Sequence, residues 1–411
     1  MYVSLRDRPT SETGPRTGRV ATTVVLLGVV SLLTDVSSEM VASVLPLYLT
    51  AQLGLGYLAY GFIDGLYQGV SALVRIGGGY AGDRGGRPKW VAAIGYAVSA
   101  LSRLALLPAH GIAAITAVIT ADRLGKGLRT APRDALIADS SEPATLGRSF
   151  GVHRALDTLG AAIGPLVAFG LLAAVPGGYD SVFVVSSAFA ICGVALLVLF
   201  VPDLRRATGA ARIGLRRAIG QLTGPRLRRP LVAAALLGVL TVGDGFLYLS
   251  LQRRDNLAAE MFPLLYVGTN LAYLCLAVPL GRLADRIGRA PVLLGGHVVL
   301  AAAYLMAAGP VTGTLATLVV LALLGAFYAA TDGVLPALIS VLIASETRGT
   351  GIAAAQTVVA LARFVSSLAF GSLWIVVGRG QALLVVAGLL TAAVPVAAWL
   401  LRTREMVEVS G

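Results

Sequence analysis

Twelve stretches of mainly apolar residues divide this sequence. They lie at 20–46, 57–81, 90–108, 112–138, 149–174, 181–201, 231–251, 262–283, 291–309, 313–343, 350–377 and 381–401. A helix needs about 20 mainly apolar residues to cross the hydrocarbon core of a bilayer. Only 13% of the residues are charged, against about 25% in soluble domains. The pattern predicts an all-α polytopic membrane protein with twelve spans, and it excludes a soluble enzyme, a disordered chain and a disulfide-stabilised secreted domain.

The polar segments between the stretches predict the domain organisation. We expect an N-terminal tail at 1–19, a six-helix bundle at 20–201, a basic central loop at 202–230, a second six-helix bundle at 231–401 and a C-terminal tail at 402–411. Most basic residues of the connections fall on one side of the membrane, and Arg253, Arg254 and Arg379 fall on the other. Because cytoplasmic loops are enriched in arginine and lysine, both tails and the central loop are expected in the cytoplasm. The net charge of +12 therefore needs no nucleic-acid partner.

A glycine- and arginine-rich motif occurs once in each predicted half. GGYAGDRGGR at 78–87 is echoed by PLGRLADRIGR at 279–289, and Asp35 and Asp244 hold comparable places in the first and seventh spans. Two such halves predict a parallel repeat of six-helix units. The first motif resembles the signature loop between helices two and three of the major facilitator superfamily. We expect both copies to form a cytoplasmic gate, made of Gly79, Asp83, Arg84, Gly86 and Arg87, and of Gly281, Asp285, Arg286, Gly288 and Arg289.

The fourth span carries a second resemblance to the same family. RLGKGLRTA at 123–131 is similar to its RxxQGxGxA pattern, but Lys126 and Arg129 replace an uncharged glutamine and a glycine. The resemblance implies that Arg123 takes part in proton coupling. The two added cations either bind an anionic substrate or pair with acidic residues in a salt-bridged gate.

The fifth span resembles the antiporter motif of exporters in the superfamily. Gly151, Gly160, Gly164 and Pro165 match its spacing, although its final glycine pair is missing. Small residues let helices approach closely, and proline removes a backbone hydrogen bond. Generic helix packing would explain the same residues, but in the family this pattern accompanies export.

Acidic residues within the spans are the candidates for proton binding. Asp35 and Glu39 lie four residues apart in the first span, so they share a helix face. Two ionised carboxylates so close would repel each other, and burial also favours the protonated form. His153 and Asp157 share a face in the fifth span in the same way and form a candidate relay. Permanent pairing of these acids with arginine is the alternative.

Other charges within the spans are expected to face the substrate cavity, because an intramembrane charge is costly away from water or protein. These residues are Asp122, Lys126, Arg154, Asp244, Asp332 and Arg363.

The resemblance implies two six-helix bundles around a central cavity that opens alternately to the two sides. It implies a secondary transporter, a proton-coupled antiporter exporting a small polar or charged drug or metabolite. We therefore expect a monomer in a bacterial inner membrane, with a small-molecule substrate, protons and lipid as partners and with no cofactor.

Four other functions compete with export. Import of an organic anion on the same fold is favoured by the cations of the fourth span. Metal-ion efflux is disfavoured because the sequence has no histidine- or cysteine-rich segment and no metal site is expected. A lipid flippase would need a lateral opening between helices. A membrane-embedded enzyme would need a catalytic set such as HExxH, and the sequence contains none.

Overall fold

The computed structural model describes residues 20–85, 87–142, 145–203, 225–342 and 348–402. The first half contains α1 (Thr22–Leu47), its π-helical extension η1 (Tyr48–Gln52), α2 (Tyr57–Gly85), α3 (Pro88–Ala105), α4 (Gly111–Asp139), α5 (Leu146–Ala174) and α6 (Tyr179–Phe200). The second half contains α8 (Pro225–Val239), α9 (Asp244–Asp255), the 3-10 turn η3 (Ala259–Met261), α10 (Phe262–Ile287), α11 (Arg289–Ala308), α12 (Thr314–Thr331), α13 (Val334–Val341), α14 (Arg348–Val377) and α15 (Arg379–Leu401).

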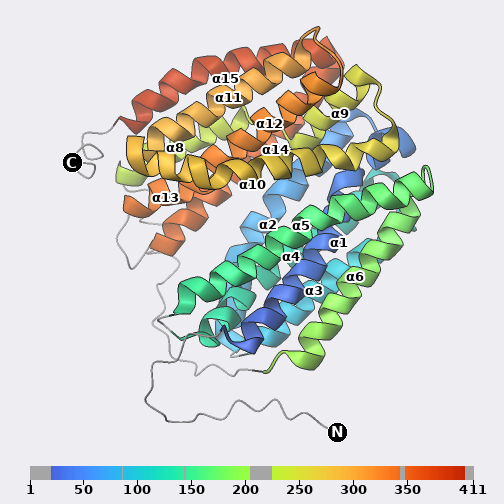
Figure 1. The fold of residues 1–411 in the computed structure, drawn as a ribbon, viewed down its shortest axis with the longest axis vertical. Coiled ribbons are helices and arrows are strands. Elements are labelled where there is room, and N and C mark those ends of the chain that lie inside the picture. Colours follow the sequence, from blue (N-terminus) through green and yellow to red (C-terminus); the bar gives the residue numbers. More distant parts are fainter. Residues whose placement is uncertain (1–19, 86, 143–144, 204–224, 343–347, 403–411) are drawn as a thin grey trace.

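These helices form two bundles that lie side by side (Figure 1). Within the described residues, nine helical stretches are long and apolar enough to cross a membrane. The predicted all-α, two-bundle fold of a multi-pass membrane protein is confirmed. The predicted tails lie almost wholly outside the described residues, as does the central loop from 204 to 224. Helix α8 begins at Pro225, earlier than the predicted end of that loop, because proline is well suited to the first position of a helix.

Two predicted spans are interrupted where the sequence predicted continuous helices. The stretch 240–243 separates α8 from α9, and the backbone N–H of Val242 donates to the Tyr304 hydroxyl at 2.8 Å. Asp332 and Gly333 separate α12 from α13. The second break has a local cause, because Pro336 has no N–H to donate to the carbonyl of Asp332 four residues earlier. The breaks place Asp244 and Asp332 at helix ends inside the bundle.

The two halves meet through α2 and α14, which pack along each other near the start of α2 and the end of α14. The glycines there allow the approach: a Cβ atom added to Gly371 would lie 2.5 Å from the carbonyl oxygen of Tyr57. The Ser367 hydroxyl donates to Asp64 Oδ2 at 2.6 Å across the same interface. The halves are therefore held together at the end of the molecule formed by η1, α9 and the α14–α15 turn (Figure 1).

An aromatic cluster fills the interface at this joined end. The ring of Phe246 in α9 lies 4.7 Å from that of Tyr60 in α2 and 5.1 Å from that of Phe370 in α14, measured between ring centroids. The rings of Tyr57 and Trp374 stack at 4.5 Å between α2 and α14. Such aromatic pairs stabilise a contact beyond their burial, so this end of the molecule is closed.

Candidate functional site

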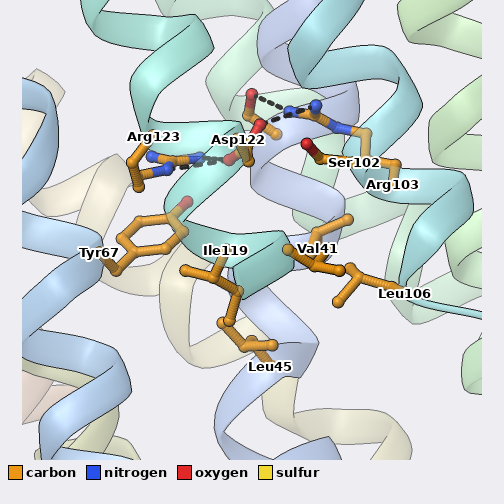
Figure 2. A pocket seen from close by; sticks show the side chains of 11 residues that line it. Val41, Leu45, Tyr67, Ser102, Arg103, Leu106, Ile119, Asp122 and Arg123 are labelled. Carbon is orange, nitrogen blue, oxygen red and sulfur yellow. Dashed lines mark hydrogen bonds and ion pairs between the residues drawn. The ribbon is translucent and has the colours of Figure 1, made fainter. Parts of the chain in front are cut away.

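A buried ion cluster surrounds Asp122 in α4. Its carboxylate lies 3.0 Å from Arg103 Nη1 of α3 and also pairs with the neighbouring Arg123. Arg103 donates to the Ser38 hydroxyl at 2.7 Å. Figure 2 shows Asp122 between the two arginines, with the Tyr67 ring below Arg123; the guanidinium carbon lies 3.7 Å from the ring centroid. Each charge of the cluster thus has a partner inside the first half.

The space beside this cluster is small. Its volume is about 20 Å³, and a cavity needs about 10–15 Å³ to hold one water molecule. Asp122 and Arg123, predicted to serve substrate binding and proton coupling, are therefore placed beside a space too small for an organic substrate.

A second cluster joins three helices of the first half. Asp35 Oδ1 of α1 lies 3.8 Å from Arg129 Nη2 of α4, and the carboxyl groups of Asp35 and of Asp157 in α5 interact with each other. Arg133 of α4 lies 3.9 Å from Asp157 Oδ1 and 2.8 Å from Asp134 Oδ1. Two interacting carboxyl groups can share one proton. This cluster can therefore hold a proton between α1 and α5, next to two arginines.

His153 lies beside the second cluster and contacts it through the Ser31 hydroxyl. Its Nε2 atom is 2.9 Å from the Ser31 hydroxyl, which also accepts from Arg133 at 3.4 Å. Asp157 is reached from the other side by Arg154, whose side chain is 78% exposed. The two residues of the predicted His153–Asp157 relay are thus connected through Arg133, and Arg154 is placed near the surface.

Glu39 and Lys126 differ from the paired residues around them. Within the described ranges neither side chain has a hydrogen bond, nor an ion pair within 4.0 Å. Glu39 of α1 and Lys126 of α4 do influence each other electrostatically across the space between these helices. Their charges therefore act on each other at a distance and not through a direct contact with a described residue.

The fifth-span glycines pack α5 against α1. A Cβ atom at Gly164 would lie 2.7 Å from the carbonyl oxygen of Val36, and one at Gly160 would collide with the carbonyl oxygen of Leu32. Gly151 lies on the surface with open space around it, and Pro165 is buried inside the continuous helix α5. Two of the three motif glycines therefore hold the helices that carry Asp35 and Asp157 together.

We expect Gly164→Ala to lower the thermal unfolding temperature of the purified protein by several degrees, because α5 must move away from α1. Gly170→Ala is the matched control, since Gly170 lies in the same helix with open space around its Cα atom. The measurement is thermal unfolding in detergent. Equal unfolding temperatures for the two variants would contradict the close packing.

The two gate motifs are described to different extents. Gly79, Asp83 and Arg84 lie near the end of α2, but their side chains and the whole of Gly86 fall outside the described residues, and Arg87 is exposed before α3.

In the second copy, Gly288 adopts φ +100° between α10 and α11, a backbone region that favours glycine. Arg289 donates to the carbonyl oxygen of Ala337 at 3.1 Å and so ties α11 to α13. Asp285 and Arg286 are exposed, and Gly281 has open space around it.

A larger cavity of about 340 Å³ lies in the second half. Asp332, at the α12–α13 break, and Arg363 of α14 both line it. Asp244 is held nearby, where its Oδ1 accepts a hydrogen bond from the Tyr328 hydroxyl at 2.5 Å. Within the described residues Arg363 forms no ion pair within 4.0 Å with Asp244 or Asp332, although it influences both electrostatically.

Sequence reasoning missed part of this lining. Gln68 of α2, His297 of α11 and Gln356 of α14 face the same cavity. The available signal was a polar side chain inside an apolar run, but that signal does not tell which helix face turns inward.

Two helical bundles in a multi-pass membrane protein, with a cavity lined by an aspartate and an arginine, are typical of a membrane transporter. The chain belongs to the Major Facilitator Superfamily, whose family model matches residues 27–266 and 248–410. It is a secondary transporter of that superfamily, as the sequence motifs predicted.

Relatives and solved structures agree with this assignment. An uncharacterised MFS-type transporter of Methanocaldococcus jannaschii is 30% identical over 377 residues, covering 89% of this chain and 93% of the relative. An uncharacterised protein of Mycobacterium tuberculosis is 28% identical over 330 residues, covering 78% and 74% of the two chains.

The fold resembles that of the nucleoside transporter NupG, with a TM-score of 0.76, 14% identity, and coverage of 93% of this chain and 100% of the other. It also resembles a POT family transporter in complex with 5-aminolevulinic acid, with a TM-score of 0.77, 12% identity, and coverage of 93% and 96%.

Proposed function

We propose that this protein is a proton-coupled antiporter that exports a small polar or charged organic compound. The observation that carries the proposal is the cluster in which Asp35 of α1 faces Arg129 at 3.8 Å and Asp157 of α5 faces Arg133 at 3.9 Å, with the two carboxyl groups interacting across the helices. A carboxyl pair that shares a proton between two helices can gain or lose that proton as the surrounding charges move.

The proposed orientation places both termini in the cytoplasm of a bacterium and the protein in its inner membrane. The excess of arginine and lysine in the connections on one side of the membrane supports this, because such residues are enriched in cytoplasmic loops. The closed aromatic end then faces outward, and the 340 Å³ cavity is reached from the cytoplasm. The structure in hand would be the inward-facing state, which is ready to load a substrate for export.

The proposed cycle follows from these contacts. Protons from outside load Asp35 or Asp157, directly or past His153. Loading both carboxyls removes the charge that holds Arg129 and Arg133 in place. The two halves then rock about the α2–α14 interface, and the contact at Asp83 forms or breaks with them. The Gly160 and Gly164 packing supports export because it keeps α1 and α5 moving as one unit.

Import of an organic anion is the second candidate, and Lys126 is the observation that favours it. Its ammonium has no ion pair within 4.0 Å in the described part of the chain. An anionic substrate would supply the missing partner on its way inward.

The test uses inverted membrane vesicles energised to an acid interior, with a pH-sensitive dye. Cationic drugs, organic anions and divalent metals are added in turn. We expect one class of compound to dissipate the proton gradient in wild-type vesicles. The rate of dissipation should be at least tenfold lower in Asp35→Asn and in Asp35→Asn with Glu39→Gln. Asp180→Asn is the control, because Asp180 is exposed at the start of α6.

Two results would count against antiport. If Asp35→Asn, alone or with Glu39→Gln, exchanges protons as fast as wild type does, Asp35 does not couple proton movement to transport. If no class moves protons but labelled anions accumulate in whole cells, the protein is an importer.

A further inference from the structure

Two opposite charges line the large cavity without neutralising each other. Asp332 sits at the α12–α13 break, and its side chain is exposed to the cavity. Arg363 projects from α14, with its guanidinium carbon 5.6 Å from the centroid of the Tyr328 ring. In the described residues neither charge has an ion pair within 4.0 Å, although each affects the other electrostatically. The site therefore presents a fixed anion and a fixed cation to whatever enters.

Arg363 has capacity for a further ligand. Its Nε atom is buried and has no hydrogen-bond partner among the described residues. A buried polar group without a partner costs free energy, and a guanidinium presents a planar fork that matches a carboxylate. A carboxylate entering the cavity could bind the part of the Arg363 guanidinium that lines it.

Asp332 offers the complementary contact. Its carboxylate accepts hydrogen bonds only, and an ammonium group is a donor of three. A ligand with a single charge would satisfy one of the two residues and leave the other without a partner. A ligand that carries both charges would satisfy both at once.

We propose that this cavity binds a small zwitterion, an ammonium carboxylate of amino-acid size, with its carboxylate on Arg363 and its ammonium on Asp332. The inference rests on the proposed transport function and names the substrate class. The volume of about 340 Å³ lies near the lower end of ligand pockets. Phe327 and Leu293 supply an apolar wall for a side chain.

Gln68 gives the site a link to transport. It comes from α2 of the first half, while the other lining residues come from the second half. A bound zwitterion therefore touches both halves, and rocking of the halves would change its contacts. This dependence on conformation is what a carried substrate needs.

The test measures equilibrium binding to the purified full-length protein in detergent, by isothermal titration, with no proton gradient. The probes are the twenty proteinogenic amino acids and β-alanine. The tightest probe is then compared with its decarboxylated amine and its deaminated acid. We expect the zwitterion to bind at least tenfold more tightly than either analogue.

Variants of Arg363 and Asp332 test which residue binds the carboxylate of the ligand and which binds its ammonium. Arg363→Gln should bind the amine as tightly as the zwitterion, and Asp332→Asn should bind the acid as tightly as the zwitterion. Arg363→Lys should fall between wild type and Arg363→Gln, because it keeps the charge and loses the fork. Arg282→Gln and Asp203→Asn, both at exposed residues, are the controls. Thermal unfolding without ligand verifies that each variant is folded.

The proposal is overturned if no zwitterion binds, or if a singly charged analogue binds wild type as tightly. It is also overturned if the variants weaken all three molecules equally. These outcomes are distinct from failure of the antiport proposal: binding without proton movement would refute coupling alone, and antiport of another chemical class without zwitterion binding would refute this inference alone.

Discussion

The Asp122→Asn variant is expected to lose most of its folded yield. Arg103 and Arg123 both pair with the Asp122 carboxylate inside α3 and α4, and the side chains of both arginines are almost fully buried. Removing one partner of a buried ion pair costs about 3–5 kcal/mol, because the other charge stays buried without compensation. The loss is measured as the unfolding temperature and the monodisperse fraction of detergent-purified protein.

The matched control is Asp134→Asn in the same helix. Asp134 also pairs with an arginine, Arg133, but its side chain is 44% exposed. Exposed pairs contribute about 0–1 kcal/mol, so this variant should purify as wild type does. If both variants have the same unfolding temperature, the Asp122 cluster is not a structural centre of the first half.

The Gly371→Val variant should fold and yet transport at least tenfold more slowly. A side chain at Gly371 meets the Tyr57 carbonyl across the α2–α14 interface. Overpacking of this kind costs about 1–3 kcal/mol, and the cost falls only on the state in which this end is closed. The protein is then shifted toward the state that is open there, and alternation slows.

Gly388→Val serves as its control, because Gly388 lies on the exposed face of α15 with open space around it. Hydrogen exchange at the start of α2 should rise in Gly371→Val and stay unchanged in the control. Wild-type transport by Gly371→Val would show that the closed end does not open during the cycle.

The spans could be predicted from the sequence because the lipid demands about 20 apolar residues in a row. The helix breaks could not. The stretch 231–251 is mainly apolar, and the backbone N–H of Val242 at the break is bound by a hydroxyl of Tyr304, more than 60 positions away. The local signals were the neighbouring glycine and aspartate residues, Gly243–Asp244 and Asp332–Gly333, and the proline Pro336.

The candidate site shows the same division. Helical spacing put Asp35 and Glu39 on one face of α1, but it could not show that Asp157 approaches Asp35 from α5. Helical spacing also could not identify Arg103 of α3 as the residue that pairs with Asp122 of α4. Which charges pair across helices depends on the rotation of each helix about its axis, and the apolar pattern of a nearly all-hydrophobic span leaves that rotation open.

The breaks in α8–α9 and α12–α13 lie in the second half alone among the described spans, while the first half keeps continuous helices and holds the ion pairs of Asp122 and Asp35. The two halves thus differ in structure: the second has broken helices beside the large cavity, and the first has buried ion pairs between continuous helices. Changes at the breaks can alter which molecule is recognised without disturbing the ion pairs of the other half. Substitutions intended to change ligand recognition can therefore be placed in the second half, while the ion pairs of the first half are left unchanged.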